Sequence, residues 1–459
     1  MRAGAALVGA ALVIAALVGA ALICAALLAG LLGGALAGPA ATAVAAPAIP
    51  AGLVPQPPTP PPLRTGPPAG RQPGPAPGLE APLRCTPPAA DGASAGTAPP
   101  GLRLAEAHRL ATGRGQVIAV IDTGVAPHPL LAGRLTGGGD YLTGGDGLDD
   151  CDGHGTAVAG LLAAAPEGRD RSSEPVGIAP GARLLSIRQS SPSYSVPGPD
   201  RALRPAGDTD TLAEAVVLAV RGGADVVNIS EAVCLSPERA AAVGAPLQAA
   251  LRFAAEADVV VVAAAGNLGS GSCAANGFRQ VSLPGWYADH ILTVGAVDPG
   301  DAAAPFTVPG PWVDVAAPGS GLRSLAVGGG TTAEGVTGTS FAAPWAAGLA
   351  ALVRERFPEL TAPQVVDRIL ATARRAPDFR GALGYGVVDP VAALTAVPAL
   401  LQPAAAPAAA PAVAPLAGTA PQPAQPEERG WPVDLLAAGA LLTMATLTAA
   451  LLRRRPRRT

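Results

Sequence analysis

Residues 116–122 read QVIAVID, an apolar run with many β-branched side chains that ends in one carboxylate, Asp122. Runs of similar character follow at residues 224–230 (ADVVNIS), 258–267 (DVVVVAAAGN) and 291–297 (ILTVGAV). Strands that are apolar on both faces are typical of a parallel sheet whose two faces are covered. Stretches with helical spacing separate these runs, for example residues 210–220 and 245–257. The sequence therefore predicts an α/β fold of three layers, a parallel sheet with helices on both faces.

The composition changes along the 459-residue chain, and these changes predict six segments. In chain order they are residues 1–46, 47–84, 85–397, 398–430, 431–452 and 453–459. The first begins with Arg2, continues with a long Ala/Leu/Val run and ends in small residues, which is the order of a cleaved secretory signal peptide. Because the apolar run is long for such a signal, an uncleaved signal-anchor is the alternative.

Pro-rich segments flank the globular part, residues 85–397. Residues 47–84 form an N-terminal extension and residues 398–430 a Pro/Ala-rich linker. Such compositions bury too little apolar surface to offset the entropy lost on ordering, so we expect semi-extended linkers.

The C-terminus combines an apolar segment with a basic tail. The stretch from Leu435 to Leu452 is just long enough to span a bilayer, and the tail RRRPRRT (453–459) predicts a cytoplasmic end. A surface amphipathic helix is the alternative, which the absence of a polar face disfavours. We therefore expect a single-pass protein of the cell membrane with its globular domain outside the cytoplasm.

The net charge of −3 argues against nucleic acid as a partner.

Three polar side chains lie in strings rich in small residues. They are Asp122 in VIAVIDTGV, His154 in DGHGTAVAGLLAA and Ser340 in GTSFAAPWAAGLAALV. A carboxylate at the carboxyl end of a strand lies where open α/β sheets build their sites. A serine at the start of a helix gains from the helix dipole and from free backbone N–H groups. Each string alone is a weak signal, but the three together are specific.

In this order the strings resemble the signatures of the subtilisin-like serine protease family. The resemblance implies an endopeptidase acting on protein or peptide substrates, with Asp122, His154 and Ser340 as its catalytic triad. It also implies that Asn267, at the end of DVVVVAAAGN, donates to the oxyanion, a contribution worth about 10²–10³ in turnover. No cofactor and no metal is expected. We interpret the acidic loop at residues 144–155 as solvated, because its carboxylates lack the ligand spacing of a calcium loop.

The run ADVVNIS resembles the strand with which substrates pair in this family. Asn228, Ile229 and Ser230 are then expected to offer an edge to an extended peptide.

Four cysteines lie outside the predicted signal segment, which contains Cys24. They are Cys85, Cys151, Cys234 and Cys273, and an oxidising compartment favours two disulfides. Zinc is disfavoured because no pair has the short spacing of structural zinc sites. Cys234 and Cys273 follow consecutive parallel strands whose outgoing loops emerge at one edge, which favours their pairing and leaves Cys85 for Cys151. Three connectivities are open at this point.

The extension with Cys85, the position of Cys151 before His154, and the C-terminal membrane segment together resemble the mycosins. These are membrane-bound subtilisin-like proteases of type VII secretion systems. The resemblance implies cleavage of a limited set of secreted proteins and association with the secretion complex. The alternatives are a mainly structural subunit of that complex and a general extracellular degradative enzyme. Because residues 47–84 are too short and Pro-rich for a folded inhibitory propeptide, we hypothesise that they wrap the domain as a permanent arm.

Overall fold

The computed structural model describes residues 58–82, 84–85, 99–165, 176–198, 200–275, 279–376 and 381–397. The predicted signal peptide, C-terminal linker, membrane helix and basic tail lie outside these residues. The chain divides into two compact units, and the described residues all belong to the first, Met1–Ala406. Among the described helices, none is long and apolar enough to cross a membrane.

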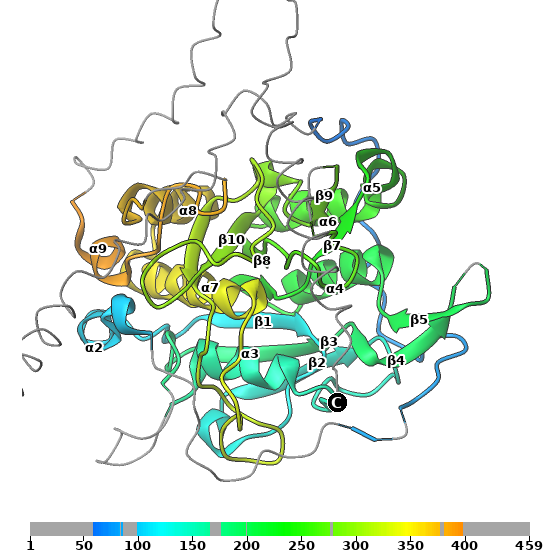
Figure 1. The fold of residues 1–459 in the computed structure, drawn as a ribbon. Coiled ribbons are helices and arrows are strands. Elements are labelled where there is room, and N and C mark those ends of the chain that lie inside the picture. The colour runs from blue at the N-terminus through cyan, green and yellow to red at the C-terminus, as the bar shows by residue number, and fades with distance from the viewer. Residues whose placement is uncertain are drawn as a thin grey trace, which may run out of the picture. The chain divides into compact units, whose positions relative to one another are not determined.

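A seven-stranded sheet forms the centre of the fold, and all its neighbouring strands run parallel (Figure 1). In spatial order the strands are β11 (Val315–Pro318), β10 (Leu292–Val297), β8 (Val260–Ala264), β6 (Val226–Ile229), β1 (Val117–Asp122), β3 (Arg183–Arg188) and β2 (Leu135–Asp140). Short antiparallel pairs join β4 (Ser191–Pro197) to β5 (Leu203–Ala206) and β7 (Val233–Leu235) to β9 (Val281–Leu283).

Helices cover both faces of the sheet. They are α2 (Leu104–Ala107), α3 (His154–Ala163), α4 (Thr209–Arg221), α5 (Pro237–Val243), α6 (Ala245–Glu256), α7 (Thr339–Arg356), α8 (Ala362–Thr372) and α9 (Pro390–Thr395). Short 3₁₀ turns occur at η2 (Pro100–Leu102), η3 (Pro129–Leu131) and η4 (Ala288–His290). One core lies between the sheet and α3, α7 and α8, and the other between the sheet and α4 and α6. The predicted three-layer parallel fold is confirmed.

The side chains of β1 show why its sequence is apolar throughout. Successive strand residues point to opposite faces, so Ile118 and Val120 enter the core under α7, whereas Ala119 and Ile121 enter the core under α4. All four side chains are fully buried. Asp122 is the last residue of the strand and therefore lies at the carboxyl edge of the sheet.

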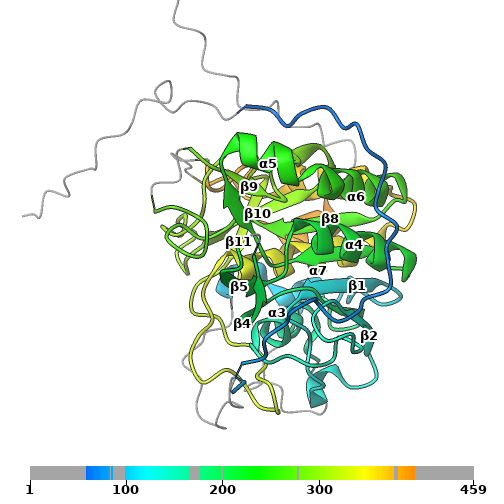
Figure 2. The ribbon, with the colours of Figure 1, turned by 90° about the vertical axis from the view of Figure 1, so that its right-hand side faces the viewer.

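The described part of the N-terminal extension lies along the globular domain and contacts it at several points. Figure 2 shows it (blue) passing along α6 and α4 and on towards β4. Arg71 forms an ion pair with Glu214 of α4 at 3.0 Å, and Glu80 pairs with Ser195 of β4 as an antiparallel bridge. Prolines already restrict the backbone of the unfolded chain, so ordering this segment on the domain costs less entropy than composition alone suggests.

The first described residues of the extension pack in a groove between α6 and the segment around η4. The indole nitrogen of Trp286 donates to the carbonyl oxygen of Pro58 at 2.9 Å. The Gln248 amide donates to the carbonyl oxygen of Pro61 at 3.1 Å. Proline lacks an N–H group, so its free carbonyl is the polar group that a protein can recognise, as in other aromatic-lined sites for Pro-rich segments.

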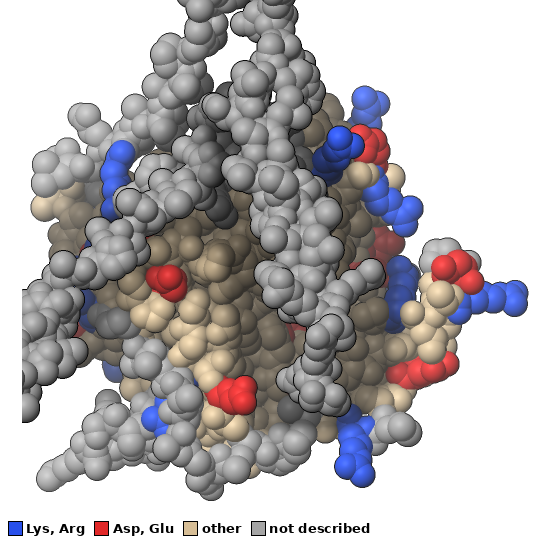
Figure 3. Space-filling view, viewed as in Figure 1, with Lys and Arg blue, Asp and Glu red and all other residues tan. Residues whose placement is uncertain are grey.

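The arginines on the face drawn in Figure 3 lie apart, mostly around its periphery, with acidic side chains among them. Where its described residues are visible, this face shows no dense positive patch of the kind that binds phosphate backbones.

We expect Trp286→Phe to loosen the extension without altering the sheet. The substitution keeps an aromatic ring but removes the hydrogen bond to Pro58. This loss should raise the fraction of molecules with a detached extension roughly 2- to 10-fold. Trypsin cleavage after the exposed Arg64 should accelerate by that factor, measured by the appearance of the new terminus at Thr65.

Trp312→Phe is the matched control. Trp312 lines the same groove, but its indole nitrogen bonds to no described group. Equal cleavage rates in the two variants would show that the indole–carbonyl contact does not hold the extension.

Candidate active site

The imidazole of His154 and the carboxylate of Asp122 meet at the carboxyl edge of the sheet. Nδ1 of His154 lies 2.7 Å from Oδ1 of Asp122. The same oxygen accepts the backbone N–H of Thr123 at 2.7 Å, which fixes the carboxylate. Asp122 is fully buried, whereas 28% of the His154 side chain is exposed. One ring nitrogen therefore faces a buried anion, and the imidazole remains accessible from outside.

Glycine at position 155 permits this contact. His154 is the first residue of α3, and the next residue packs against the turn that follows Asp122. A β-carbon at Gly155 would lie 2.0 Å from the carbonyl oxygen of Gly124. Any larger residue would push the start of α3 away from β1.

Asp150 holds the loop before His154 to the turn after β1. Its carboxylate accepts hydrogen bonds from the Thr123 hydroxyl (2.8 Å), the Gly153 N–H (2.8 Å) and the Thr156 N–H (2.8 Å). Burial raises the pKa of Asp150 despite these hydrogen bonds. The expectation of a solvated acidic loop is wrong at this residue, which is 6% exposed. The role of Asp150 could not be predicted, because an aspartate in a Gly/Asp-rich loop has no local mark of burial.

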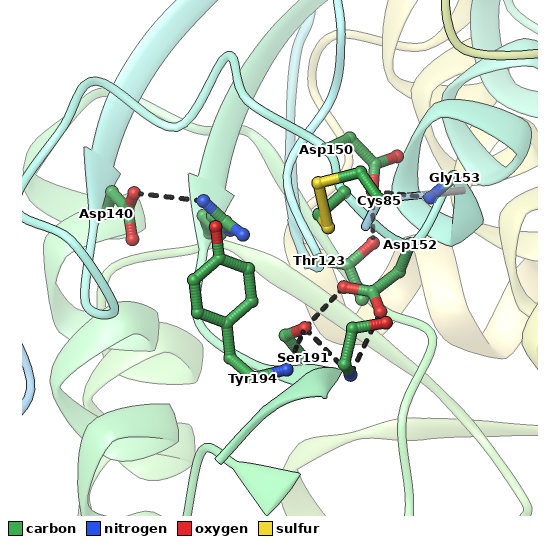
Figure 4. The surroundings of a disulfide bond; sticks show 11 residues. Cys85, Thr123, Asp140, Asp150, Asp152, Gly153, Ser191 and Tyr194 are labelled. Atoms are coloured by element: carbon green, nitrogen blue, oxygen red, sulfur yellow. Dashed lines mark hydrogen bonds and ion pairs between the residues drawn. A yellow bond between two sulfur atoms is a disulfide. The ribbon is translucent and has the colours of Figure 1, made fainter. Parts of the chain in front are cut away.

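A disulfide ties the same loop to the N-terminal extension. Cys85 is bonded to Cys151, with their α-carbons 4.5 Å apart, and Figure 4 shows the bond beside Asp150 and Asp152. The second disulfide joins Cys234 to Cys273, with their α-carbons 4.7 Å apart. Both pairings are those favoured by the sequence.

Ser340 is the second residue of α7, at its N-terminus. The ring of its neighbour Phe341 lies 5.0 Å from the ring of His154, measured between centroids. The first turn of α7 therefore lies against the His154 ring. A nucleophile at this end of a helix is favoured by the positive end of the dipole.

Thr339 orients the side chain of Asn267, which follows β8. The amide oxygen of Asn267 accepts the Thr339 N–H at 3.0 Å and contacts the Thr339 hydroxyl at 3.1 Å. The Thr339 hydroxyl in turn accepts the Gly266 N–H at 3.1 Å. The amide nitrogen lies close to Gly338, where an added β-carbon would be 3.3 Å from it. The Asn267 side chain therefore lies at the start of α7.

Asn228 and Ile229 do not offer an open edge, and this part of the sequence interpretation is wrong. Both residues lie in β6, which pairs with β1 on one side and β8 on the other. The sequence could not show this, because strand order depends on tertiary packing. The chain leaves the sheet after Ile229, so only Ser230 and the residues after it have backbone groups free of the ladder. The Asn228 amide donates to the Ser230 hydroxyl at 2.9 Å.

Negative charge surrounds the imidazole. Burial lowers the pKa of His154, but Asp122, Glu231 and Asp150 together outweigh burial and raise it to about 9. Of these, Glu231 has no role in the sequence interpretation. Its own pKa is raised to about 8 by burial and by Asp122 and Asp152, while His154 acts in the opposite direction.

Two of the other described histidines make side-chain contacts with backbone carbonyl groups. His108 Nε2 lies 2.9 Å from the carbonyl oxygen of Ile178, and His128 Nε2 lies 2.9 Å from that of Gly330. His290 ends the turn η4. Within the described ranges, no group of three or more His, Cys, Asp or Glu side chains is arranged to hold a metal ion.

Comparisons with known proteins agree on one family. Residues 113–386 match the Subtilase family. Mycosin-4 of Mycobacterium tuberculosis is 44% identical over 311 residues, which cover 64% of this chain and 67% of that protein. The structure of the MycP3 protease from the type VII (ESX-3) secretion system matches with a TM-score of 0.65 and 40% identity, covering 74% of this chain and all of that one. A chain in the periplasmic assembly from the ESX-5 inner membrane complex matches with a TM-score of 0.65 and 37% identity, covering 81% and 100%.

Gly155→Ala should separate His154 from Asp122. The added carbon would clash with the Gly124 carbonyl, so we expect peptide hydrolysis to fall by at least about 10²-fold, as misplacement of a catalytic group does. Gly66→Ala is the control, since a β-carbon there meets nothing within 4 Å. A Gly155→Ala variant with undiminished kcat/KM would contradict this account of the contact.

The rate of peptide hydrolysis should rise with pH on the alkaline side of neutrality. A general base must be unprotonated, and the His154 pKa is raised to about 9 from its ordinary 6.5. The neutral imidazole therefore accumulates only as the pH rises towards 9. We expect kcat/KM to increase across this range, with its midpoint well above 6.5, in initial-rate measurements with a fluorogenic peptide. A plateau already reached at pH 7 would contradict this.

Proposed function

This chain belongs to the subtilase family and, within it, to the mycosins, and we propose that it processes secreted proteins at a type VII secretion complex. It is a serine endopeptidase. The observation that carries the proposal is the 2.7 Å contact between His154 and Asp122, with Asn267 held by Thr339 nearby.

We assign the chemical roles as follows. His154 removes the proton of Ser340 as the hydroxyl attacks the peptide carbonyl, and later returns it to the leaving amine. Asp122 holds the imidazole tautomer and stabilises the imidazolium. Asn267 donates its amide N–H to the oxyanion, together with the backbone N–H of Ser340. The acyl-enzyme on Ser340 is then hydrolysed by water.

Association with a secretion complex is supported by the likeness to a chain of the ESX-5 periplasmic assembly, which matches over its whole length. We propose the same setting here: membrane association, with the peptidase domain outside the cytoplasm. The predicted signal peptide (1–46) and the predicted membrane segment within residues 431–452 would provide export and anchoring.

The same likeness favours a second candidate function, a structural subunit that stabilises the complex. The N-terminal extension is relevant to both candidates. It contacts Trp286, Glu214 and Ser195 and is joined to Cys151 by a disulfide. These contacts support the hypothesis that the extension is a permanent arm and that the enzyme is active without its removal.

Ser340→Ala distinguishes the two functions. The variant should keep its thermal unfolding midpoint but lose at least about 10³-fold in peptide hydrolysis, because the nucleophile is gone. The variant is also introduced into a strain that lacks the gene for this protein. If the structural role alone supports secretion, the variant should restore the amount of secreted proteins. Hydrolysis by the variant at near wild-type rates would refute the assignment of Ser340.

A further inference from the structure

Glu231 lies across the end of the strand that carries Asp122. It follows β6 by two residues, and its carboxylate contacts the hydroxyl of Ser190, which follows β3 by two residues. Strands β6 and β3 flank β1 on opposite sides. The Glu231 side chain must therefore reach over the carboxyl end of β1, where Asp122 holds the imidazole.

Asp152 binds the residues that directly follow Ser190. It lies two residues before His154, next to the disulfide-bonded Cys151. Its carboxylate accepts the Ser191 hydroxyl at 2.5 Å and the Ser193 N–H at 3.1 Å (Figure 4). Two carboxylates on different elements thus hold residues 190–193.

The electrostatic coupling agrees with this geometry. The charge of Glu231 acts on His154, and the charges of Asp122 and Asp152 act on Glu231. No arginine of the described residues forms an ion pair with Glu231. Neighbouring carboxylates that are partly buried disfavour one another's ionisation, and a cation brought among them would favour their charged forms.

We propose that Glu231, together with Asp152, selects substrates that carry arginine or lysine close to the scissile bond. The cationic side chain of the substrate would then lie near the His154 imidazole. This specificity rests on the proposed function. Ser230 and Glu231 are the first residues of this segment outside the sheet, so a peptide pairing with them passes the Glu231 carboxylate. A guanidinium fits carboxylates well, because its planar donors match their oxygens.

Such a substrate would also tune the base. A guanidinium between the carboxylates offsets part of the field that raises the pKa of His154. The neutral imidazole would then be available at lower pH in the substrate complex than in the free enzyme. This gives a readout that a merely structural role of Glu231 would not produce.

Paired peptides test the specificity. Arginine is placed in turn at the two positions on each side of the scissile bond, and each peptide is matched by one with citrulline, which keeps the shape but lacks the charge. With the full-length protein, arginine at one position should raise kcat/KM about tenfold or more over citrulline, as hydrogen bonds to charged groups do. The midpoint of the pH dependence of kcat should be lower for that arginine peptide than for the matched citrulline peptide.

Glu231→Gln should reduce the arginine preference to less than about threefold, because the amide keeps the shape and loses the charge. Asp152→Asn provides a second variant if the first folds poorly. Glu256→Gln is the control, since it removes a carboxylate that pairs with Arg252 on the surface of α6 and should leave the preference unchanged.

Equal rates with arginine and citrulline at every position would overturn the inference while leaving the peptidase assignment intact. A preference that survives both Glu231→Gln and Asp152→Asn would also overturn it. Failure of the wild-type protein to cleave any of the peptides would count against the proposed function, and the specificity would fall with it.

Discussion

The contact between His154 and Asp122 depends on one constraint, the parallel order of the sheet. Because β3, β1, β6 and β8 run in one direction, their carboxyl ends and the loops that follow lie at one edge. Asp122 ends β1 at that edge, Asn267 follows β8, and α3 and α7 both begin there. Reversing one of these strands would take its polar residue to the opposite edge. The apolar strands therefore position the chemistry although they take no part in it.

Covalent and hydrogen-bonded ties then reduce the freedom of the loops at this edge. The Cys85–Cys151 disulfide and the Asp150 carboxylate hold the loop before His154, and Thr339 holds Asn267. Such ties preorganise donors, so that little rearrangement is needed as charge develops. The accumulation of carboxylates has a cost, since it raises the pKa of the base above its ordinary value. A cationic substrate residue would offset part of this rise in pKa, so the same carboxylates would favour cationic substrates.

Local patterns were sufficient for much of this structure. The strand ending at Asp122, the helix starting at His154 and the helix containing Ser340 are each written in one continuous string, and the disulfides follow from the loops they join. What failed depends on packing between distant segments. Asn228 and Ile229 lie inside the sheet because β8 pairs with β6, which no local string records. The burial of Asp150, the docking of Pro58 on Trp286 and the reach of Glu231 towards Ser190 likewise arise only when separate elements meet.

The most direct measurement is active-site labelling with a fluorophosphonate, followed by peptide mapping. If Asp122, His154 and Ser340 form one nucleophilic unit, the reagent should modify the wild-type protein at Ser340. Labelling should fall steeply in His154→Ala and in Asp122→Asn, because the hydroxyl then lacks its base or the oriented tautomer. Labelling of a different serine, or labelling of Ser340 at an undiminished rate in both variants, would contradict the account.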